Sequence, residues 1–545
     1  MQFKYSKIAS VLIASGALSL PFSAFANDSA ELEELRALVQ ELSQKVKVIE
    51  RKGEITEEVA AAAKSSTPVV KASSSGFGLE SADGKNSIKF SGLLQADYRS
   101  YQSGANDVRG RSNARAGELD KEGFHEANDT ALLRRVRPTI QGTLLGKYDF
   151  RFTPDFAGGS ATAVDAYIDA RLDPAFKIRA GKYKPFVGLE RLQGGGDIKF
   201  VERSYVTNAI LPNRDVGVSL YGDVLGDKLS YAVGVNNGVV DGGNASTGTE
   251  FDGSKEVTAR LFATPFKDSV NALAGLGFGV AGTYTNIDGE KNLNFTDTSA
   301  ADATRNGLPS YVTNGQQTFF RYGGGVVADG NRTRIAPQAS YYYGPFGLIT
   351  EYARVSQDVS KAIGGSPSAG GAIPALATAN GVLNDTNRKL KHDAWEVAAS
   401  YLITGEDSSF KGVKPKNDFD LDKGGWGAWE LVARYSEINL DNDTFTNENG
   451  DKAAEFGAGS AAAAAKTSAY ADATRSAKSA KSWTAGVNWY LNQNTKIQLN
   501  YEHTSFEGGA LQKGLLQTTN ANATGSNVRD RESEDAILAR LQVAF

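Results

Sequence analysis

From about Phe77 to the last residue, apolar and polar side chains alternate with a period of two in stretches of roughly ten residues. One such stretch places Trp395, Val397, Ala399 and Tyr401 on one face and Glu396, Ala398 and Ser400 on the other. Successive side chains of a strand point to opposite sides of a sheet, so each stretch predicts a strand with one apolar and one polar face. Segments rich in Gly, Asn and Asp separate the stretches and predict turns.

Sixteen stretches of this kind can be counted, and they begin near Ile88, Arg134, Tyr148, Val164, Phe176, Val216, Leu229, Val257, Phe278, Arg334, Phe346, Trp395, Trp429, Trp483, Lys496 and Ile537. Trp and Tyr stand at the ends of the apolar faces, where they suit the two interfaces of a bilayer better than the surface of a soluble β-sandwich. A barrel of this size leaves an aqueous lumen. We therefore predict an all-β transmembrane barrel of about 16 antiparallel strands over residues 77–545.

The final stretch carries the clearest of these patterns. Its apolar face consists of Ile537, Ala539, Leu541, Val543 and Phe545, and its other face of Leu538, Arg540, Gln542 and Ala544. The sequence stops on Phe545, which resembles the terminal signature by which outer-membrane barrels are recognised for assembly. Arg540 lies an odd number of residues from Phe545, so we expect it to face the lumen.

The N-terminal residues have the organisation of a secretory signal peptide. Lys4 and Lys7 precede an apolar stretch from Ile8 to Leu20, and Ala24-Phe25-Ala26 forms a small-residue cleavage site. The stretch is too short to span a bilayer as an anchor. We predict a signal peptide over residues 1–26, the outer membrane of a bacterium with two membranes as the location, and a periplasmic N-terminal segment.

Residues 27–63 follow a helical pattern instead. Apolar residues recur at alternating steps of three and four, at Leu32, Leu35, Val39, Leu42, Val46 and Ile49. This heptad pattern predicts a short α-helical coiled coil, and a helix of this length needs partner chains to be stable. An amphipathic helix packed on the barrel is the alternative. Residues 64–76, rich in Ser, Thr, Pro and Ala, predict a flexible linker.

The composition excludes several classes of function. The chain has no Cys, three His and one Met, so disulfides, thiolate chemistry and a His-rich metal site are not expected. It contains no G-x-S-x-G, H-E-x-x-H, P-loop or C-x-x-C motif. Loss of Lys4 and Lys7 takes the formal net charge from −4 to −6, which argues against a nucleic-acid partner. We therefore predict no enzyme activity, no metal and no cofactor.

Basic residues gather on the polar faces of the early strands. Residues 132–220 hold 14 Lys and Arg against 9 Asp and Glu. The bases expected to line the pore are Arg135, Arg137, Arg151, Arg171, Lys177, Arg179, Arg260, Arg334, Arg434 and Arg540. In a narrow pore of low dielectric constant they would stabilise a passing anion. Alternatively, they pair with the lumenal acids Asp149, Asp155, Asp165, Asp169, Glu396 and Glu430 and leave no net field.

Several long segments resemble the phosphate-selective porin O/P family. These segments are LLRRVRPTIQGTLLGKYDFRFTPDFAGG, VDAYIDARL, KIRAGKYKPFVGLERL, DIKFVERSYVTNAILPNRDVGVSLYG and RTRIAPQASYYYGPFGLITEY. The resemblance extends from about Gly76 to Phe545. It implies a sixteen-stranded barrel, usually a trimer, in which the loop after the fifth strand folds inward as a constriction.

In this sequence that loop would be Pro185–Arg214. The charged residues that the resemblance assigns to the constriction are Arg191, Lys199, Arg203 and Arg214 together with Glu190, Asp197 and Glu202. Members of the family that are named for phosphate carry Arg and Lys at the narrowing. The constriction expected here is mixed in charge.

Together these patterns predict a porin, a water-filled channel for passive diffusion of small hydrophilic solutes and ions. The expected partners are outer-membrane lipid, further copies of the chain in a trimer, and small anions or phosphate as permeants. The alternative is a structural protein that tethers the envelope or acts as an adhesin. In that case the N-terminal coiled coil would contact peptidoglycan or another periplasmic partner.

Overall fold

The computed structural model describes residues 29–103, 106–107, 125–126, 128–245, 252–289, 306–323, 326–361, 386–446, 469–471, 473, 475–511 and 528–545. The predicted signal peptide, residues 1–26, lies outside them. The chain divides into two compact units, residues 1–67 and residues 68–545.

The described part of the first unit is helical. Helix α1 (Ser29–Ser66) covers residues 29–63 of the segment predicted to form a coiled coil and continues three residues beyond it. Val39, Leu42, Val46 and Ile49, which belong to the heptad pattern, are all exposed on this helix. No helix in the described residues has the length and apolar character needed to cross a membrane.

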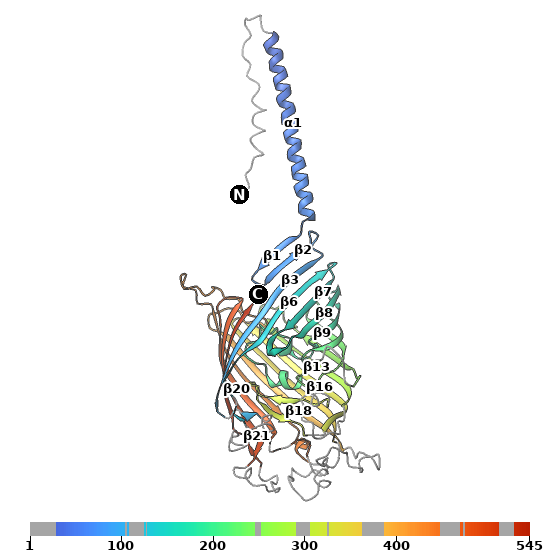
Figure 1. The fold of residues 1–545 in the computed structure, drawn as a ribbon, viewed down its shortest axis with the longest axis vertical. Helices are drawn as coiled ribbons and strands as arrows, with labels where there is room; N and C mark the ends of the chain where they lie inside the picture. Colours follow the sequence, from blue (N-terminus) through green and yellow to red (C-terminus); the bar gives the residue numbers. More distant parts are fainter. Residues whose placement is uncertain are drawn as a thin grey trace. The chain divides into compact units, whose positions relative to one another are not determined.

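The second unit is a closed β-barrel (Figure 1). In the described residues its sixteen strands are β3 (Ser87–Ser103), β6 (Thr130–Leu144), β7 (Tyr148–Asp155), β8 (Thr162–Asp173), β9 (Phe176–Tyr183), β10 (Asp215–Val224), β11 (Leu229–Asn236), β12 (Glu256–Ala263), β13 (Leu276–Asp288), β16 (Val326–Tyr343), β17 (Phe346–Lys361), β18 (Thr386–Leu402), β19 (Ala428–Asn439), β20 (Ala477–Tyr490), β21 (Thr495–Leu511) and β23 (Glu534–Ala544). Each strand is antiparallel to the next, and β23 pairs with β3 to close the barrel. Every predicted strand start lies within one of these strands, so the predicted barrel is confirmed.

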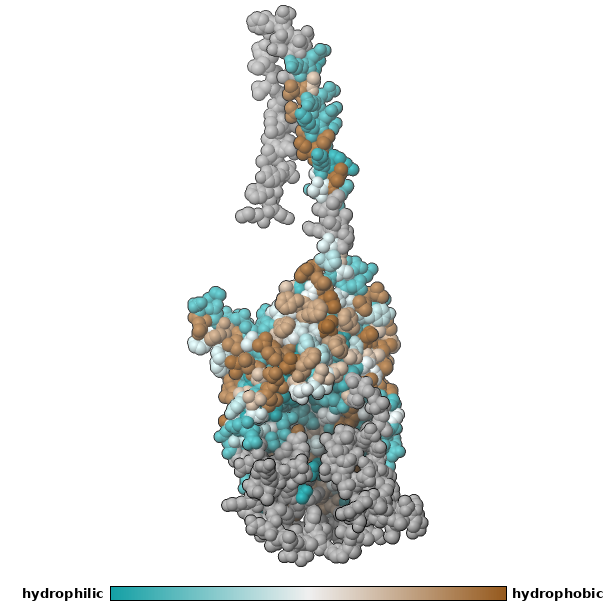
Figure 2. All heavy atoms as spheres, in the orientation of Figure 1, coloured by the Kyte–Doolittle hydropathy of each residue, from teal (hydrophilic) through white to brown (hydrophobic). Residues whose placement is uncertain are grey.

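The alternation of the sequence corresponds to the two faces of the wall. On β23, Leu541 is 51% exposed, whereas its neighbour Arg540 is 1% exposed. Figure 2 shows apolar residues gathered over the outer surface of the barrel. Aromatic rings from adjacent strands meet on this outer surface, as Trp429 and Trp489 do with ring centroids 5.0 Å apart. An apolar band with aromatic residues suits the hydrocarbon core of a membrane.

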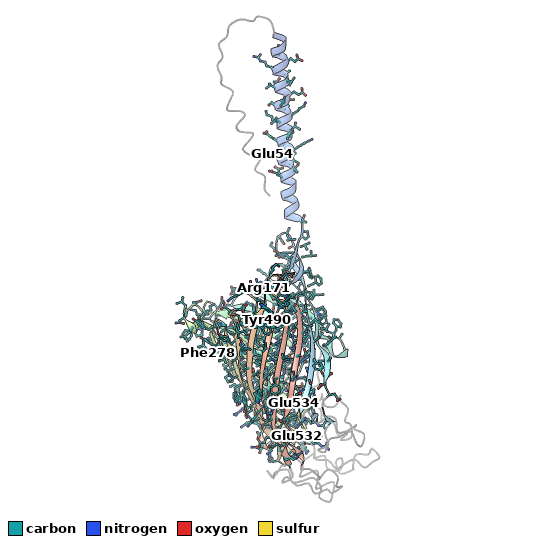
Figure 3. All side chains as sticks on the ribbon, turned by 90° about the vertical axis from the view of Figure 1, so that its left-hand side faces the viewer. Glu54, Arg171, Phe278, Tyr490, Glu532 and Glu534 are labelled. Carbon is teal, nitrogen blue, oxygen red and sulfur yellow. The ribbon has the colours of Figure 1, made fainter. Side chains whose placement is uncertain are left out.

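The connections divide into two sets. Short turns such as Gly344-Pro345, between β16 and β17, lie at one rim together with the longer connection of residues 403–427, and most of the long connections lie at the other rim. In Figure 3, Arg171 and Tyr490 lie toward the rim of the short turns, and Glu532 and Glu534 lie toward the opposite rim. In outer-membrane barrels the short turns are periplasmic and the long loops are extracellular.

An additional hairpin precedes the barrel. Strands β1 (Val69–Ser73) and β2 (Gly76–Glu80) pair with each other, and β2 pairs with the first four residues of β3. The predicted flexible linker, residues 64–76, therefore contains the end of α1 and a hydrogen-bonded strand. Val69 and Val70 have β-branched side chains that favour extended backbone, a signal that the Ser and Thr around them obscured.

Candidate pore constriction

The loop between β9 and β10, residues 185–214, lies against the inner face of the barrel. It contains the short helix α2 (Leu189–Leu192) and a helical turn, η3 (Val206–Ile210). The N–H groups of Leu189 and Glu190 donate to the Glu351 carboxylate on β17, at 2.6 and 2.8 Å. On the other side of the loop, Val201 N–H donates to Asn500 Oδ1 on β21 at 2.8 Å. The loop is therefore anchored to wall strands that lie far apart in the sequence.

Glu202 is the most heavily paired acid of this loop. Its carboxylate is 2.6 Å from Arg134 Nε, 3.0 Å from Arg99 Nη2 and 3.9 Å from Arg540 Nη2. Burial by itself would raise the pKa of Glu202, but the Arg134 guanidinium and its neighbours outweigh that effect and hold the pKa well below its ordinary value. Glu202 thus ties the loop to β3, β6 and β23 through charge.

Most of the predicted pore-lining bases have an acidic partner. The pairs are Arg137 with Asp155 at 2.7 Å, Arg151 with Asp165 at 3.9 Å, Arg171 with Asp149 at 2.7 Å, Lys177 with Asp223 at 2.9 Å, Arg179 with Asp169 at 2.6 Å, Arg334 with Glu256 at 2.5 Å, Arg434 with Glu190 at 3.7 Å, and Arg540 with Asp97 at 2.7 Å. Four of the lumenal acids considered above, Asp149, Asp155, Asp165 and Asp169, are among these partners. Glu430 pairs with Lys199 of the loop at 2.7 Å. The bases in these pairs therefore follow the alternative in which lumenal bases pair with lumenal acids.

The other predicted constriction residues differ in their partners. Arg214 Nε donates to Asp165 Oδ1 at 2.9 Å. Asp197 accepts a hydrogen bond from Gly412 N–H at 3.0 Å. Two predicted wall bases bind neutral amides instead, Arg135 to Gln95 and Arg260 to Gln338.

A second group of bases has no acidic partner within 4.0 Å in the part of the chain that the structure describes. Lys184 Nζ and Arg203 Nη2 both donate to the carbonyl oxygen of Gln193, at 2.6 and 2.9 Å. Arg191 donates to the carbonyl oxygen of Thr207. We call Lys184, Arg191 and Arg203 the basic cluster. Its members donate to backbone carbonyl oxygens and not to carboxylates.

Burial is the main reason that the pKa values of the basic cluster are lowered. Burial lowers the pKa of Lys184, and the positive charges of Arg203 and Arg214 lower it further. Burial also lowers the pKa of Arg203 to about 10, against an opposing effect of Glu190. Cations that depress one another's pKa are stabilised when an anion approaches.

Sequence reasoning missed two parts of this region. Lys184 precedes the predicted loop and was not assigned to it, although it stands directly before Pro185. The second part is a hairpin of β14 (Ser310–Val312) and β15 (Thr318–Arg321), which lies between the predicted strands that begin near Phe278 and Arg334. Tyr311 and Phe319 on this hairpin are almost fully buried.

The hairpin packs against the constriction loop. The rings of Phe319 and Tyr205 lie 6.0 Å apart, and Asn314 Nδ2 donates to Glu502 Oε2 on β21 at 2.9 Å. The side chains of Tyr311 and Phe319 are buried, and the hairpin contacts both the constriction loop and the wall. Residues 290–305 lie outside the described residues.

Comparison with known proteins places this barrel among outer-membrane channels. The family described as phosphate-selective porin O and P matches residues 107–545. Porin O of Pseudomonas aeruginosa is 22% identical over 468 residues, which cover 78% of this chain and 84% of Porin O.

Two solved structures resemble the chain at low identity. OmpT of Vibrio cholerae in its trimer form has a TM-score of 0.43 and 10% identity, covering 84% of this chain and 99% of OmpT. The outer membrane channel DcaP of Acinetobacter baumannii has a TM-score of 0.44 and 11% identity, covering 84% of this chain and 97% of DcaP. The family match extends over far more than half of the chain, so the protein belongs to the phosphate-selective porin O and P family and is an outer-membrane porin.

Proposed function

We propose that this porin passes small hydrophilic solutes by passive diffusion and favours anions, phosphate among them. The observation that carries the proposal is the basic cluster of Lys184, Arg191 and Arg203. Arg191 and Arg203 are buried in the constriction loop, Lys184 directly before it is half-buried, and all three donate to backbone carbonyl oxygens. Family membership favours a channel over an enzyme.

The physical argument rests on charge in a confined space. A buried cation that is bound only to neutral acceptors stabilises an anion more strongly than a cation already paired with a carboxylate. Guanidinium groups also match the geometry of phosphate oxygens and can bind them in a bidentate manner. The paired bases along the wall contribute less to this preference, because their acidic partners cancel most of the field.

Phosphate inhibition of the chloride current tests the proposal. The purified porin is reconstituted in planar bilayers, and chloride conductance is recorded while phosphate is added. We expect saturable inhibition in the native protein. The double variant Lys184→Met and Arg203→Gln should need at least about tenfold more phosphate, as loss of charge-assisted hydrogen bonds predicts.

The matched control is Lys228→Met, which removes a base from the turn between β10 and β11, where Lys228 pairs with Asp268. This variant should behave like the native protein. Equal inhibition of all three proteins would show that the basic cluster does not bind phosphate. Absence of inhibition in the native protein would contradict the proposal that the channel favours phosphate.

Helix α1 supports a further proposal, that its heptad residues associate with those of other copies in a trimer. Leu42 and Ile49 are 56% and 68% exposed, which is unfavourable for an isolated helix in water. A related candidate is envelope tethering through peptidoglycan or a periplasmic partner. With 38 residues, α1 spans about 57 Å at the usual rise per residue.

Deletion of residues 29–66 separates these possibilities. Loss of the trimer with conductance retained supports association between copies. Loss of cell-wall attachment with the trimer retained supports tethering. No change in either property would contradict both.

A further inference from the structure

The connection between β18 and β19, residues 403–427, passes from the lumenal side of the wall to its outer side. We call it the rim connection. In its first half, Val413 packs with Leu402, Ala428 and Tyr490 in a buried cluster. The Tyr490 hydroxyl group donates to Glu430 Oε2 at 2.7 Å, and Glu430 lies on the lumenal face of β19. This half therefore lies inside the mouth of the barrel.

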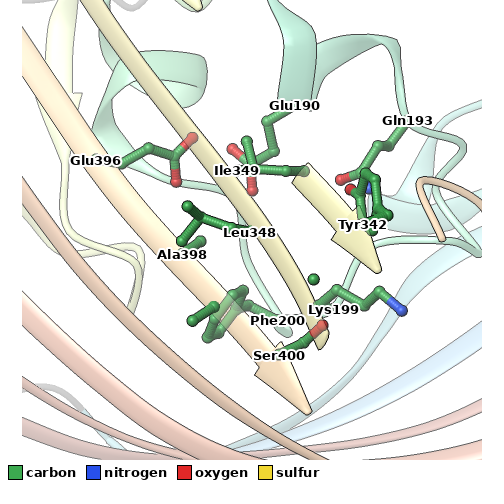
Figure 4. Close-up of a pocket in the computed structure, with 12 residues that line it drawn as sticks. Glu190, Gln193, Lys199, Phe200, Tyr342, Leu348, Ile349, Glu396, Ala398 and Ser400 are labelled. Atoms are coloured by element: carbon green, nitrogen blue, oxygen red, sulfur yellow. The ribbon is translucent and has the colours of Figure 1, made fainter. Parts of the chain in front are cut away.

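The first half of the rim connection also contacts the constriction loop. Gln193 Nε2 of the loop donates to the carbonyl oxygen of Phe410 at 2.9 Å. The Gly412 N–H donates to Asp197 Oδ1 of the loop at 3.0 Å. Figure 4 shows Gln193 beside Tyr342 of β16, and both residues line the same pocket between the loop and the wall. The rim connection thus supports the loop on this side of the lumen.

The second half of the rim connection lies on the outer side of the wall. The Phe419 N–H donates to the Leu491 carbonyl oxygen at 2.6 Å, and the Phe419 ring meets the Trp489 ring edge to face at 5.1 Å. Trp489 Nε1 in turn donates to the carbonyl oxygen of Trp426 at 2.8 Å. Trp489 and Trp429 stack on the outer surface of the barrel, so this half extends that surface.

The large apolar side chains of this half are exposed. Leu421 is 78% exposed and Trp426 is 65% exposed. Ile403, whose N–H donates to the Trp429 carbonyl oxygen at 2.9 Å, is 56% exposed. Apolar side chains on a turn are unfavourable in water, and a group of them marks a contact surface.

The position of these side chains indicates which surface they contact. Leu431 lies two residues after Trp429 on the same outer face of β19, about 7 Å along the strand, and belongs to the apolar band that contacts the membrane. The second half of the rim connection therefore borders that band at the periplasmic rim. Trp side chains favour this boundary, because the ring is apolar and its N–H is polar.

We propose that Leu421 and Trp426 insert into the periplasmic leaflet of the outer membrane and anchor the rim connection to lipid. Between them, Lys423 pairs with Asp420 at 2.9 Å, and its side chain is 84% exposed, so it can remain among the lipid headgroups. The anchor lies on the same connection that supports the constriction loop. The inference goes beyond the proposed anion preference and does not depend on it.

A fluorescent label at a single cysteine tests this anchor, because the native chain has no Cys. Leu421→Cys is labelled with the environment-sensitive fluorophore NBD in the full-length porin. The porin is then reconstituted in vesicles of phosphatidylethanolamine and phosphatidylglycerol. The emission should shift to the blue, and lipids brominated on their acyl chains should quench it. The matched control Lys411→Cys, on the lumenal half of the same connection, should be quenched at least about twofold less.

The label at Trp426→Cys gives a second reading if Leu421→Cys fails to fold, and it should behave like the label at residue 421. Aqueous iodide separates the alternatives. Strong quenching by iodide, equal to that of the Lys411→Cys label, would show that the side chains face water and would overturn the anchor. Protection from iodide without quenching by brominated lipid would place a second copy of the chain there and would also overturn it. Neither result would alter the porin function, which the conductance of the same preparation reports.

Discussion

Arg540 and Asp97 meet in a bidentate ion pair across the seam that closes the barrel. Arg540 Nε and Nη2 each donate to one Asp97 oxygen at 2.7 Å, and the two residues are register partners on β23 and β3. Both side chains are buried. The pair therefore joins the last strand of the barrel to the first on its inner face.

Removal of one partner of this pair should destabilise the barrel more than removal of both. Arg540→Met leaves Asp97 as a buried charge and should cost about 3–5 kcal/mol of the free energy of unfolding. Adding Asp97→Leu should recover part of that loss. Urea unfolding in phospholipid vesicles measures the effect, and strictly additive losses would contradict direct coupling.

Glu202→Gln should loosen the constriction loop. The amide leaves Arg99 and Arg134 without a full negative charge, at a cost of roughly 3–5 kcal/mol for a broken buried pair. Single-channel recordings should show higher conductance and more current noise than in the native protein. The control Glu437→Gln removes an acid away from the loop, and identical traces for both variants would show that Glu202 does not hold the loop.

Gly92 gives the Phe545 ring its space. Gly92 N–H donates to the Phe545 carbonyl oxygen at 2.8 Å, and a Cβ atom on Gly92 would lie 2.7 Å from Phe545 Cζ. Gly92→Leu should therefore displace the ring and cost about 1–3 kcal/mol. The fraction of heat-modifiable, folded barrel on a gel should fall. Adding Phe545→Ala should relieve the clash, and no relief would contradict this contact.

Anion preference should fall as the pH rises. Lys184 and Arg203 are positive below their pKa values, and both pKa values are lowered, that of Arg203 to about 10. As the pH is raised from neutral toward about 10, Lys184 and Arg203 therefore lose their positive charge at a lower pH than exposed Lys and Arg side chains do. Relative chloride permeability measures the change. Lys184→Met should flatten the pH profile, and an unchanged profile would show that Lys184 does not contribute.

Polar substitutions on α1 should dissociate the proposed trimer. Leu42→Asn combined with Ile49→Asn removes apolar side chains from the heptad face. Sedimentation in detergent should report a lower mass, while the conductance of each open pore stays the same. Glu41→Gln, on the polar face of the same helix, should have no effect. An unchanged mass for the double variant would show that α1 does not hold the copies together.

The strands could be predicted from sequence because the outer face of the wall contacts only the membrane and the inner face only the lumen, so apolar and polar residues alternate along each strand. Leu541 and Arg540 alternate for this reason along β23. The partners of the charged residues could not be predicted in the same way. Arg540 meets Asp97 only through the closure of the barrel, since the two residues stand at opposite ends of the sequence.

The residues that fold into the lumen were the hardest to predict. The β14–β15 hairpin contains Thr, Asn, Gly and Gln, which are typical of surface loops, and only Tyr311, Phe319 and Phe320 indicated burial. Lys184 lies between a strand and the predicted loop, so neither the alternation nor the resemblance assigned it. Its hydrogen bond to Gln193 depends on the path of the loop, which local sequence does not determine.

The reversal potential of the reconstituted channel in a potassium chloride gradient tests the central claim most directly. The basic cluster beside the constriction predicts a potential whose sign shows that chloride is more permeant than potassium. The same measurement on the Lys184→Met and Arg203→Gln double variant should move toward zero. A native channel that prefers potassium, or that shows no preference, would contradict the proposed anion selectivity.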